Sequence, residues 1–123
     1  VAAARHGHRV ALISRAGEDP FGDYIVGEAG RLGVDTRFIS RVAGVPTPVT
    51  FCEIFPPDDF PLYFYRQPTA PDLEIRQEEL DLDAIRQARI FWVTVTGLCK
   101  DPARTAQLAA LEARGRQGTT VLD

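Results

Sequence analysis

Short apolar runs alternate with amphipathic segments along most of the chain. The runs are rich in β-branched and aromatic residues, which favour strands, and they cover residues 9–14, 38–42, 89–96 and 119–122. Helices are predicted between them at residues 1–5, 19–32 and 81–88, and after residue 101. Residues 15–18 are expected to form a loop. The run at 89–96 is apolar on both faces at its start, which is typical of a strand buried in a parallel sheet.

Two of these helices share a start signal, an aspartate followed by a proline. The aspartate can accept hydrogen bonds from free N–H groups of the first turn, and proline suits the first helical position. The signal occurs at Asp19-Pro20 and at Asp101-Pro102, and Gly33 is a suitable end for the first helix. The expected packing faces are Phe21, Ile25, Ala29 and Leu32 on the first helix, and Leu108, Leu111 and the nearby alanines on the second.

A proline-rich segment at residues 45–71 interrupts this alternation. Its prolines stand at positions 46, 48, 56, 57, 61, 68 and 71. Between them lie two apolar runs, 49–55 and 62–65, joined by a turn at 56–60. Because proline is tolerated at strand ends and edges but not inside a sheet, we expect a small β-hairpin that stands off the main domain.

The whole pattern predicts an α/β fold, with a parallel sheet flanked by helices and a β-hairpin insert. The chain begins at Val1 without a methionine and ends at Asp123, inside or directly after a predicted strand. We therefore expect the sequence to be truncated at both ends.

Composition excludes several classes of function. The net charge is -3 and the arginines are scattered, so no basic face for nucleic acid is expected. No apolar run approaches the roughly 20 residues that a membrane span needs. Cys52 and Cys99 are too few for a disulfide framework and are interpreted as small buried residues in a reducing cytoplasm.

Few local motifs point to chemistry. The chain has neither a P-loop nor a Gly-x-Gly-x-x-Gly fingerprint. His6 and His8 flank one glycine without further metal-binding partners, so no metal site is predicted. Taken alone, the residues indicate an α/β domain with a hairpin flap and nothing more specific.

An ordered series of motifs resembles the ribokinase-like (PfkB) carbohydrate kinases over essentially the whole chain. The series is Ala2-Ala3-Ala4-Arg5-His6-Gly7 followed by Gly17, then Gly17-Glu18-Asp19-Pro20-Phe21-Gly22, then Leu32-Gly33-Val34-Asp35, with the hairpin where that family has its lid. The resemblance implies that residues 1–123 form part of a PfkB kinase domain, with a lid at about 45–71. It also implies that the full-length protein uses ATP and Mg²⁺.

The same resemblance places the catalytic residues outside this chain. In that family the base is an aspartate in a Gly-Ala-Gly-Asp motif far downstream, and this sequence does not contain the motif. We therefore assign no catalytic residue and no ATP-binding residue here, and we expect the chain by itself to be inactive.

Residues 47–66 and 91–98 resemble one subgroup, the 5-dehydro-2-deoxygluconokinases. That resemblance implies ATP-dependent phosphorylation of the 6-hydroxyl of 5-dehydro-2-deoxy-D-gluconate in myo-inositol catabolism. Two alternatives stay open. One is a related kinase for 2-keto-3-deoxygluconate, fructose or a nucleoside. The other is a noncatalytic α/β module whose hairpin forms a homodimer.

The resemblance also points to substrate-binding residues. Related kinases carry an aromatic-aromatic-Arg motif that maps onto Phe64-Tyr65-Arg66. Arg66 can hold a carboxylate through two parallel hydrogen bonds, and Tyr65 and Tyr63 can stack on sugar carbons. The simpler interpretation is a solvated arginine and packing aromatics. Strand alternation adds a constraint, because Arg66 points away from the tyrosine face unless the strand ends near Tyr65.

Overall fold

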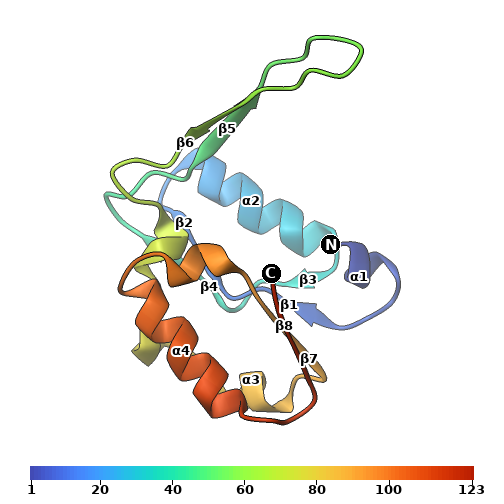
Figure 1. Cartoon of the computed structure of the whole chain (residues 1–123), viewed down its shortest axis with the longest axis vertical. Coiled ribbons are helices and arrows are strands. Elements are labelled where there is room, and N and C mark those ends of the chain that lie inside the picture. The colour runs from blue at the N-terminus through green and yellow to red at the C-terminus, as the bar shows by residue number, and fades with distance from the viewer.

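Helices and strands alternate along the chain in the computed structural model, which describes all 123 residues (Figure 1). The helices are α1 (Ala2–Arg5), α2 (Pro20–Arg31), α3 (Leu82–Gln87) and α4 (Ala103–Arg114), with 3₁₀ helices η1 (Pro71–Glu74), η2 (Gln77–Glu79) and η3 (Val95–Leu98). The strands are β1 (Val10–Ala11), β2 (Ser14–Gly17), β3 (Val34–Asp35), β4 (Ile39–Val42), β5 (Val49–Cys52), β6 (Leu62–Tyr65), β7 (Ile90–Val93) and β8 (Thr119–Leu122).

Three of the four strand pairs are parallel. β1 pairs with β3, β2 with β4, and β7 with β8, while β5 and β6 form the antiparallel hairpin. In Figure 1, α2 lies beside β1–β4, α3 and α4 accompany β7 and β8, and the hairpin projects from the N-terminal end of α2. The α/β class and the separate hairpin are therefore confirmed. No helix is both long and apolar enough to cross a membrane.

The strand predicted at residues 9–14 is divided, and the predicted loop at 15–18 is wrong. Ala11 pairs with Asp35 and Ser14 pairs with Ile39. The segment between Asp35 and Ile39 is therefore one residue longer than the segment between Ala11 and Ser14. An extra residue of this kind interrupts the ladder in the way a bulge does. After it, the chain pairs again as β2, which runs to Gly17.

Arg15 explains why a polar-looking segment forms a strand in the interior. Its Nη1 donates to the carbonyl of Glu74 at 2.7 Å and its Nη2 to that of Arg41 at 3.4 Å. An ion pair with Glu79 at 3.4 Å adds to these bonds. A largely buried cation is tolerated where such partners replace water, and these partners come from segments distant in sequence.

The predictions of which side chains α2 and α4 bury are partly wrong. On α2, Phe21 and Ile25 are 61% and 43% exposed, whereas Gly22 is buried. On α4, Leu108 is 54% exposed, and the buried positions are Ala103, Ala106, Ala110 and Arg114. Small residues let each helix approach its neighbours closely, so the large side chains beside them are left at the surface.

The strand predicted at 89–96 is shorter than expected. β7 ends at Val93 and is followed by η3. Val93 is 4% exposed, but Ile90 and Trp92 on the other face are 63% and 60% exposed. The strand is parallel to β8, as its composition indicates, yet only one of its faces is covered in this chain.

The two aspartate-proline signals act as helix caps in different ways. Asp19 Oδ1 accepts from the Gly22 amide at 2.8 Å, and Pro20 is the first residue of α2, as predicted. The second helix begins one residue later than expected, at Ala103, and Asp101 accepts from the Thr105 amide at 3.2 Å. The Arg104 guanidinium and the Thr105 hydroxyl lower the pKa of Asp101 to about 2.

The hairpin strands pair with a defined register. The two cysteines are not buried, contrary to the prediction. Val49 lies opposite Tyr65 and Cys52 opposite Leu62, so β5 is shorter than the apolar run 49–55. Cys52 and Cys99 are free thiols, but both are exposed. Cys52 lies on a two-stranded hairpin that no other element covers, which accounts for the exposure.

Arg114 of α4 bonds to the end of α3 and to the residue before β7 from a nearly inaccessible position. It is 1% exposed, its Nη1 donates to the carbonyls of Ile85 (3.1 Å) and Arg86 (2.7 Å), and its Nη2 to that of Arg89 (3.2 Å). The first two carbonyls belong to the last turn of α3, where acceptors lack helical partners and a cation is favoured. Arg114 thus fastens α4 to the end of α3.

Replacing Arg114 with methionine should lower the free energy of unfolding by about 3 kcal/mol, because three backbone carbonyls lose a charged donor while the apolar volume is retained. Urea unfolding of the protein measures this change. Arg116→Met is the matched control, since Arg116 is exposed and should change stability by less than about 0.5 kcal/mol. Equal effects of the two substitutions would contradict this role for Arg114.

Candidate functional site

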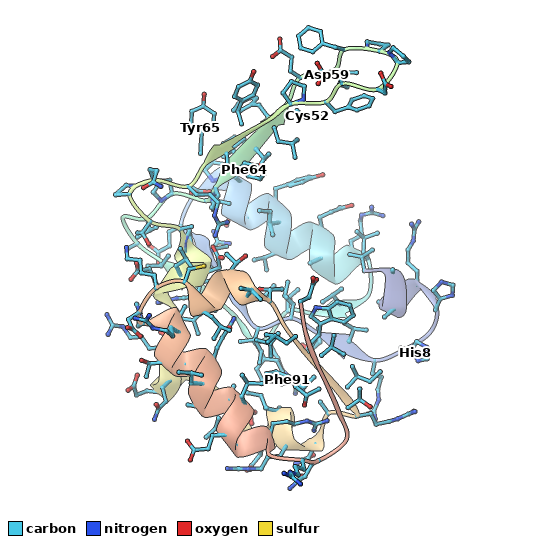
Figure 2. All side chains as sticks on the ribbon, in the orientation of Figure 1. His8, Cys52, Asp59, Phe64, Tyr65 and Phe91 are labelled. Atoms are coloured by element: carbon cyan, nitrogen blue, oxygen red, sulfur yellow. The ribbon has the colours of Figure 1, made fainter.

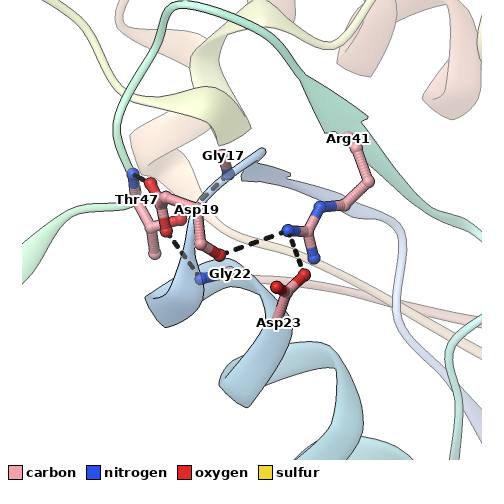
Figure 3. A network of polar contacts seen from close by, with 6 residues as sticks. All are labelled: Gly17, Asp19, Gly22, Asp23, Arg41 and Thr47. Atoms are coloured by element: carbon pink, nitrogen blue, oxygen red, sulfur yellow. Dashed lines mark hydrogen bonds and ion pairs between the residues drawn. The ribbon is translucent and has the colours of Figure 1, made fainter.

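A carboxylate at the base of the hairpin connects three segments. Asp19 Oδ1 accepts from the Gly22 amide at 2.8 Å, and its Oδ2 accepts from the Thr47 amide at 2.7 Å (Figure 3). The Thr47 hydroxyl in turn accepts from the Gly17 amide at 2.9 Å, and Thr47 is only 6% exposed. The start of α2 and the stem leading into β5 therefore meet at the Asp19 carboxylate, and the Thr47 hydroxyl ties the end of β2 to the same stem.

The close approach at this junction requires glycine. A Cβ on Gly17 would lie 2.6 Å from the Val45 carbonyl oxygen and 2.7 Å from the Thr47 amide nitrogen. A Cβ on Gly22 would lie 2.2 Å from the Gly17 carbonyl oxygen. None of these three backbone atoms can move without breaking the junction, so both glycines serve its packing.

Arg41 closes the junction on its outer side. Its Nη2 donates to Asp23 Oδ1 at 2.7 Å and to the backbone carbonyl of Asp19 at 3.4 Å. Figure 3 shows the guanidinium between these two residues. Arg41 lies in β4 and Asp23 in the first turn of α2, so the ion pair holds the helix start against the strand.

The second stem of the hairpin carries Arg66, the first of the predicted substrate-binding residues. β6 ends at Tyr65, so Arg66 lies just beyond the regular strand and is released from its alternation. Its Nη2 donates to both carboxylate oxygens of Asp72, at 3.0 and 2.8 Å. Both side chains are 32% exposed. Arg66 therefore has a carboxylate partner within the chain.

Tyr63 and Tyr65 lie on the hairpin itself and share a face. The Tyr63 hydroxyl donates to Glu53 Oε2 at 3.1 Å, and the Tyr65 ring meets Phe51 edge-on with centroids 5.6 Å apart. The two tyrosines are 50% and 65% exposed. In Figure 2, Tyr65 extends from the side of the hairpin away from α2, and Phe64 lies on the opposite side.

The structure thus groups the predicted residues in two places, the tyrosine face and the Arg66 position at the hairpin base. Sequence reasoning missed Thr47, Asp72 and Glu53, which hold the first stem, Arg66 and Tyr63. Thr47 and Asp72 each adjoin a proline at an end of the hairpin segment, but that pattern does not reveal a partner. Their roles depend on which distant side chains arrive beside them.

A hollow of about 220 Å³ lies between β7, α4 and the link from β1 to β2, and Asp72 at the hairpin base also contributes to its lining. Its lining is mostly apolar, with Ile13, Val93 and Ala106 among the contributors, and no residue of β5 or β6 belongs to it. A sugar needs several polar partners. We therefore place the candidate substrate site at the hairpin base and not in this hollow.

Comparison with known proteins decides the family. The model of the pfkB family carbohydrate kinases matches residues 1–123, the whole chain. The chain belongs to the pfkB family of carbohydrate kinases. Within this family it is 34% identical over 123 residues to the 5-dehydro-2-deoxygluconokinase of Clostridium beijerinckii, and 32% identical over 118 residues to probable fructokinase-3 of Arabidopsis thaliana.

These pfkB relatives are much longer than the chain. The alignments cover 99% and 96% of the chain but only 36% and 34% of the two relatives. The crystal structure of Xylella fastidiosa fructokinase with bound ATP superimposes with a TM-score of 0.86 at 25% identity, over 99% of this chain and 37% of that one. The partial ribokinase-like fold is therefore confirmed, together with the kinase family.

The Asp19 junction predicts a pH dependence. The Thr47 and Gly22 amides hold the pKa of Asp19 below its ordinary value of 3.8. A depressed pKa stabilises the folded state above the unfolded pKa, and this contribution is lost as the pH falls through the folded pKa. Asp19→Asn should therefore be less stable than the unsubstituted protein near neutral pH, and the difference should shrink below about pH 4.

Carboxyl titration by NMR, together with urea unfolding across pH, measures both parts of this prediction. Asp58→Asn is the control, since it removes an exposed carboxylate in the hairpin turn without touching the junction. An Asp19 carboxyl that titrates at or above 3.8 would rule out the proposed cause.

Proposed function

We propose that this chain is part of a cytoplasmic, ATP- and Mg²⁺-dependent sugar kinase that phosphorylates the 6-hydroxyl of 5-dehydro-2-deoxy-D-gluconate in myo-inositol catabolism. Membership of the pfkB family supports sugar phosphorylation. Several 5-dehydro-2-deoxygluconokinases, at 32–35% identity, support the substrate. The observation that carries the choice is Arg66 at the hairpin base, directly after an aromatic strand.

The chemistry of this substrate suits the site. An aldonic acid has a carboxylate that a guanidinium can hold through parallel hydrogen bonds. The exposed rings of Tyr63 and Tyr65 can stack on sugar carbons, and their hydroxyl groups can bond sugar oxygens. A hairpin that covers the sugar would also exclude water during phosphoryl transfer, for which Mg²⁺ neutralises charge.

Fructose is the second candidate substrate, and one contact favours it. Asp72 already neutralises Arg66, so the arginine needs no substrate carboxylate to balance its charge. The similarity to probable fructokinase-3 is nearly as strong as that to the gluconate-type kinase. The preference between an acidic and a neutral sugar therefore depends on how much of the Arg66 guanidinium the substrate can reach.

The first test is a coupled assay on the full-length protein with 5-dehydro-2-deoxygluconate, 2-keto-3-deoxygluconate and fructose. We expect preference for the first substrate and, in Arg66→Ala, a KM for it raised by about 10- to 100-fold, the range for a lost hydrogen bond to a charged group. Arg76→Ala is the matched control, since Arg76 is exposed. The 123-residue chain alone should give no turnover above a blank without protein.

A preference for fructose, with the KM of Arg66→Ala unchanged, would leave the family standing and remove the sugar-acid assignment. Turnover by the 123-residue chain alone would contradict the placement of the catalytic machinery outside it.

We also propose that the hairpin is a surface for a homodimer. It exposes apolar rings on both faces, including Phe51, Phe64 and Tyr65 at 59–65% exposure. One face can cover a sugar, which leaves the other free for a second copy. A noncatalytic module that dimerises in this way would need the same surface.

Light scattering of the full-length protein should show a dimer that Phe64→Glu converts to a monomer, because a charge would be buried in an apolar contact. Phe60→Glu in the turn is the control and should leave the dimer intact. A protein that is monomeric without substitution, or a dimer that survives Phe64→Glu, would exclude the hairpin as the interface.

A further inference from the structure

The contact between Arg66 and Asp72 engages only part of the guanidinium. Both hydrogen bonds come from Nη2, at 3.0 and 2.8 Å, and neither Nε nor Nη1 of Arg66 donates to any group of the chain. An arginine has five N–H donors in a rigid planar fork. Anchoring Nη2 therefore restricts the directions in which the remaining donors can point.

Asp72 lies on a segment that is better anchored than the hairpin. The preceding Ala70 is 0% exposed, and Pro71 at the start of η1 is also fully buried. At the end of η1, the carbonyl of Glu74 accepts from Arg15 in β2 at 2.7 Å. The carboxylate of Asp72 is therefore held by the body of the protein, while the hairpin strands before Arg66 are exposed on both faces.

We propose that Asp72 is a positioning residue for substrate binding, which holds Arg66 by Nη2 so that Nε and Nη1 face the sugar. This inference rests on the proposed sugar kinase function and adds a residue to it. The physical gain is a smaller loss of side-chain freedom on binding, since the long arginine side chain is already ordered before the substrate arrives. Asp72 itself does not touch the substrate.

The same contact limits how strongly the site favours an anion. A carboxylate 2.8 Å from Nη2 offsets much of the positive charge of Arg66. The remaining donors then act mainly through their direction, and they can bond either a carboxylate or sugar hydroxyl groups. Recognition at this position thus depends on geometry more than on charge, so loss of Asp72 should weaken binding of the preferred sugar.

A double-mutant cycle on the full-length enzyme tests the proposal, with Arg66→Ala, Asp72→Ala and the two combined, assayed with the sugar that the unsubstituted enzyme prefers. We expect Asp72→Ala to raise KM by about 5- to 10-fold, with kcat changed by less than about twofold, since only prior ordering is lost. The combined variant should have the same KM as Arg66→Ala alone, because Asp72 acts through Arg66.

Asp83→Ala is the matched control, since it also removes an aspartate paired with an arginine, here the exposed Arg86 at 2.7 Å. It should leave KM and kcat unchanged. Thermal unfolding of every variant provides a readout of stability. If Asp72→Ala lowers the melting temperature more than Asp83→Ala while kcat falls and KM does not rise, Asp72 is structural and the proposal is wrong.

The remaining outcomes distinguish a failure of the Asp72 role from a failure of the proposed contact between Arg66 and the substrate. If Arg66→Ala raises KM but Asp72→Ala does not, Arg66 binds substrate without help and only the role of Asp72 is excluded. Equal increases from Asp72→Ala in the presence and absence of Arg66 would exclude it too, since the two residues would then act independently. If Arg66→Ala leaves KM unchanged, the substrate contact itself fails, and the role of Asp72 fails with it.

Discussion

The carboxylate of Asp19 is the contact on which the arrangement of the chain depends most. It receives one amide from the first turn of α2 and one from Thr47, which precedes the hairpin. A side chain that accepts from two segments at once fixes their relative position, and here it fixes where the hairpin leaves the body. Gly17 and Gly22 make the contact possible, because a side chain at either would collide with backbone.

The interior is joined by arginines that bond mainly to carbonyl groups. Arg114 bonds to three backbone oxygens and Arg15 to two, with one additional carboxylate for Arg15. These bonds satisfy terminal guanidinium donors and backbone acceptors together, which offsets part of the cost of burying the cation, although the Nε of both arginines is buried without a partner.

The hairpin combines fixed stems with exposed strands. Thr47 is tied to Asp19 before β5, and Arg66 is tied to Asp72 after β6, while the aromatic side chains between them stay at the surface. This arrangement suits a flap whose surfaces are completed by a substrate or a second subunit. The internal Arg66–Asp72 pair also shows why an arginine in a motif does not by itself prove that a substrate is acidic.

The sequence by itself determined the α/β class, the hairpin, both capping aspartates and the family, since these depend on local periodicity, on proline and on ordered motifs. It also located Arg66 at the end of an aromatic strand. Only the tertiary structure decided that residues 14–17 form a strand, that Phe21, Ile25 and Leu108 are exposed, and that Arg66 pairs with Asp72. These three features depend on a partner distant in sequence or on close approach between elements by small residues. Neither cause produces a periodic pattern in the sequence.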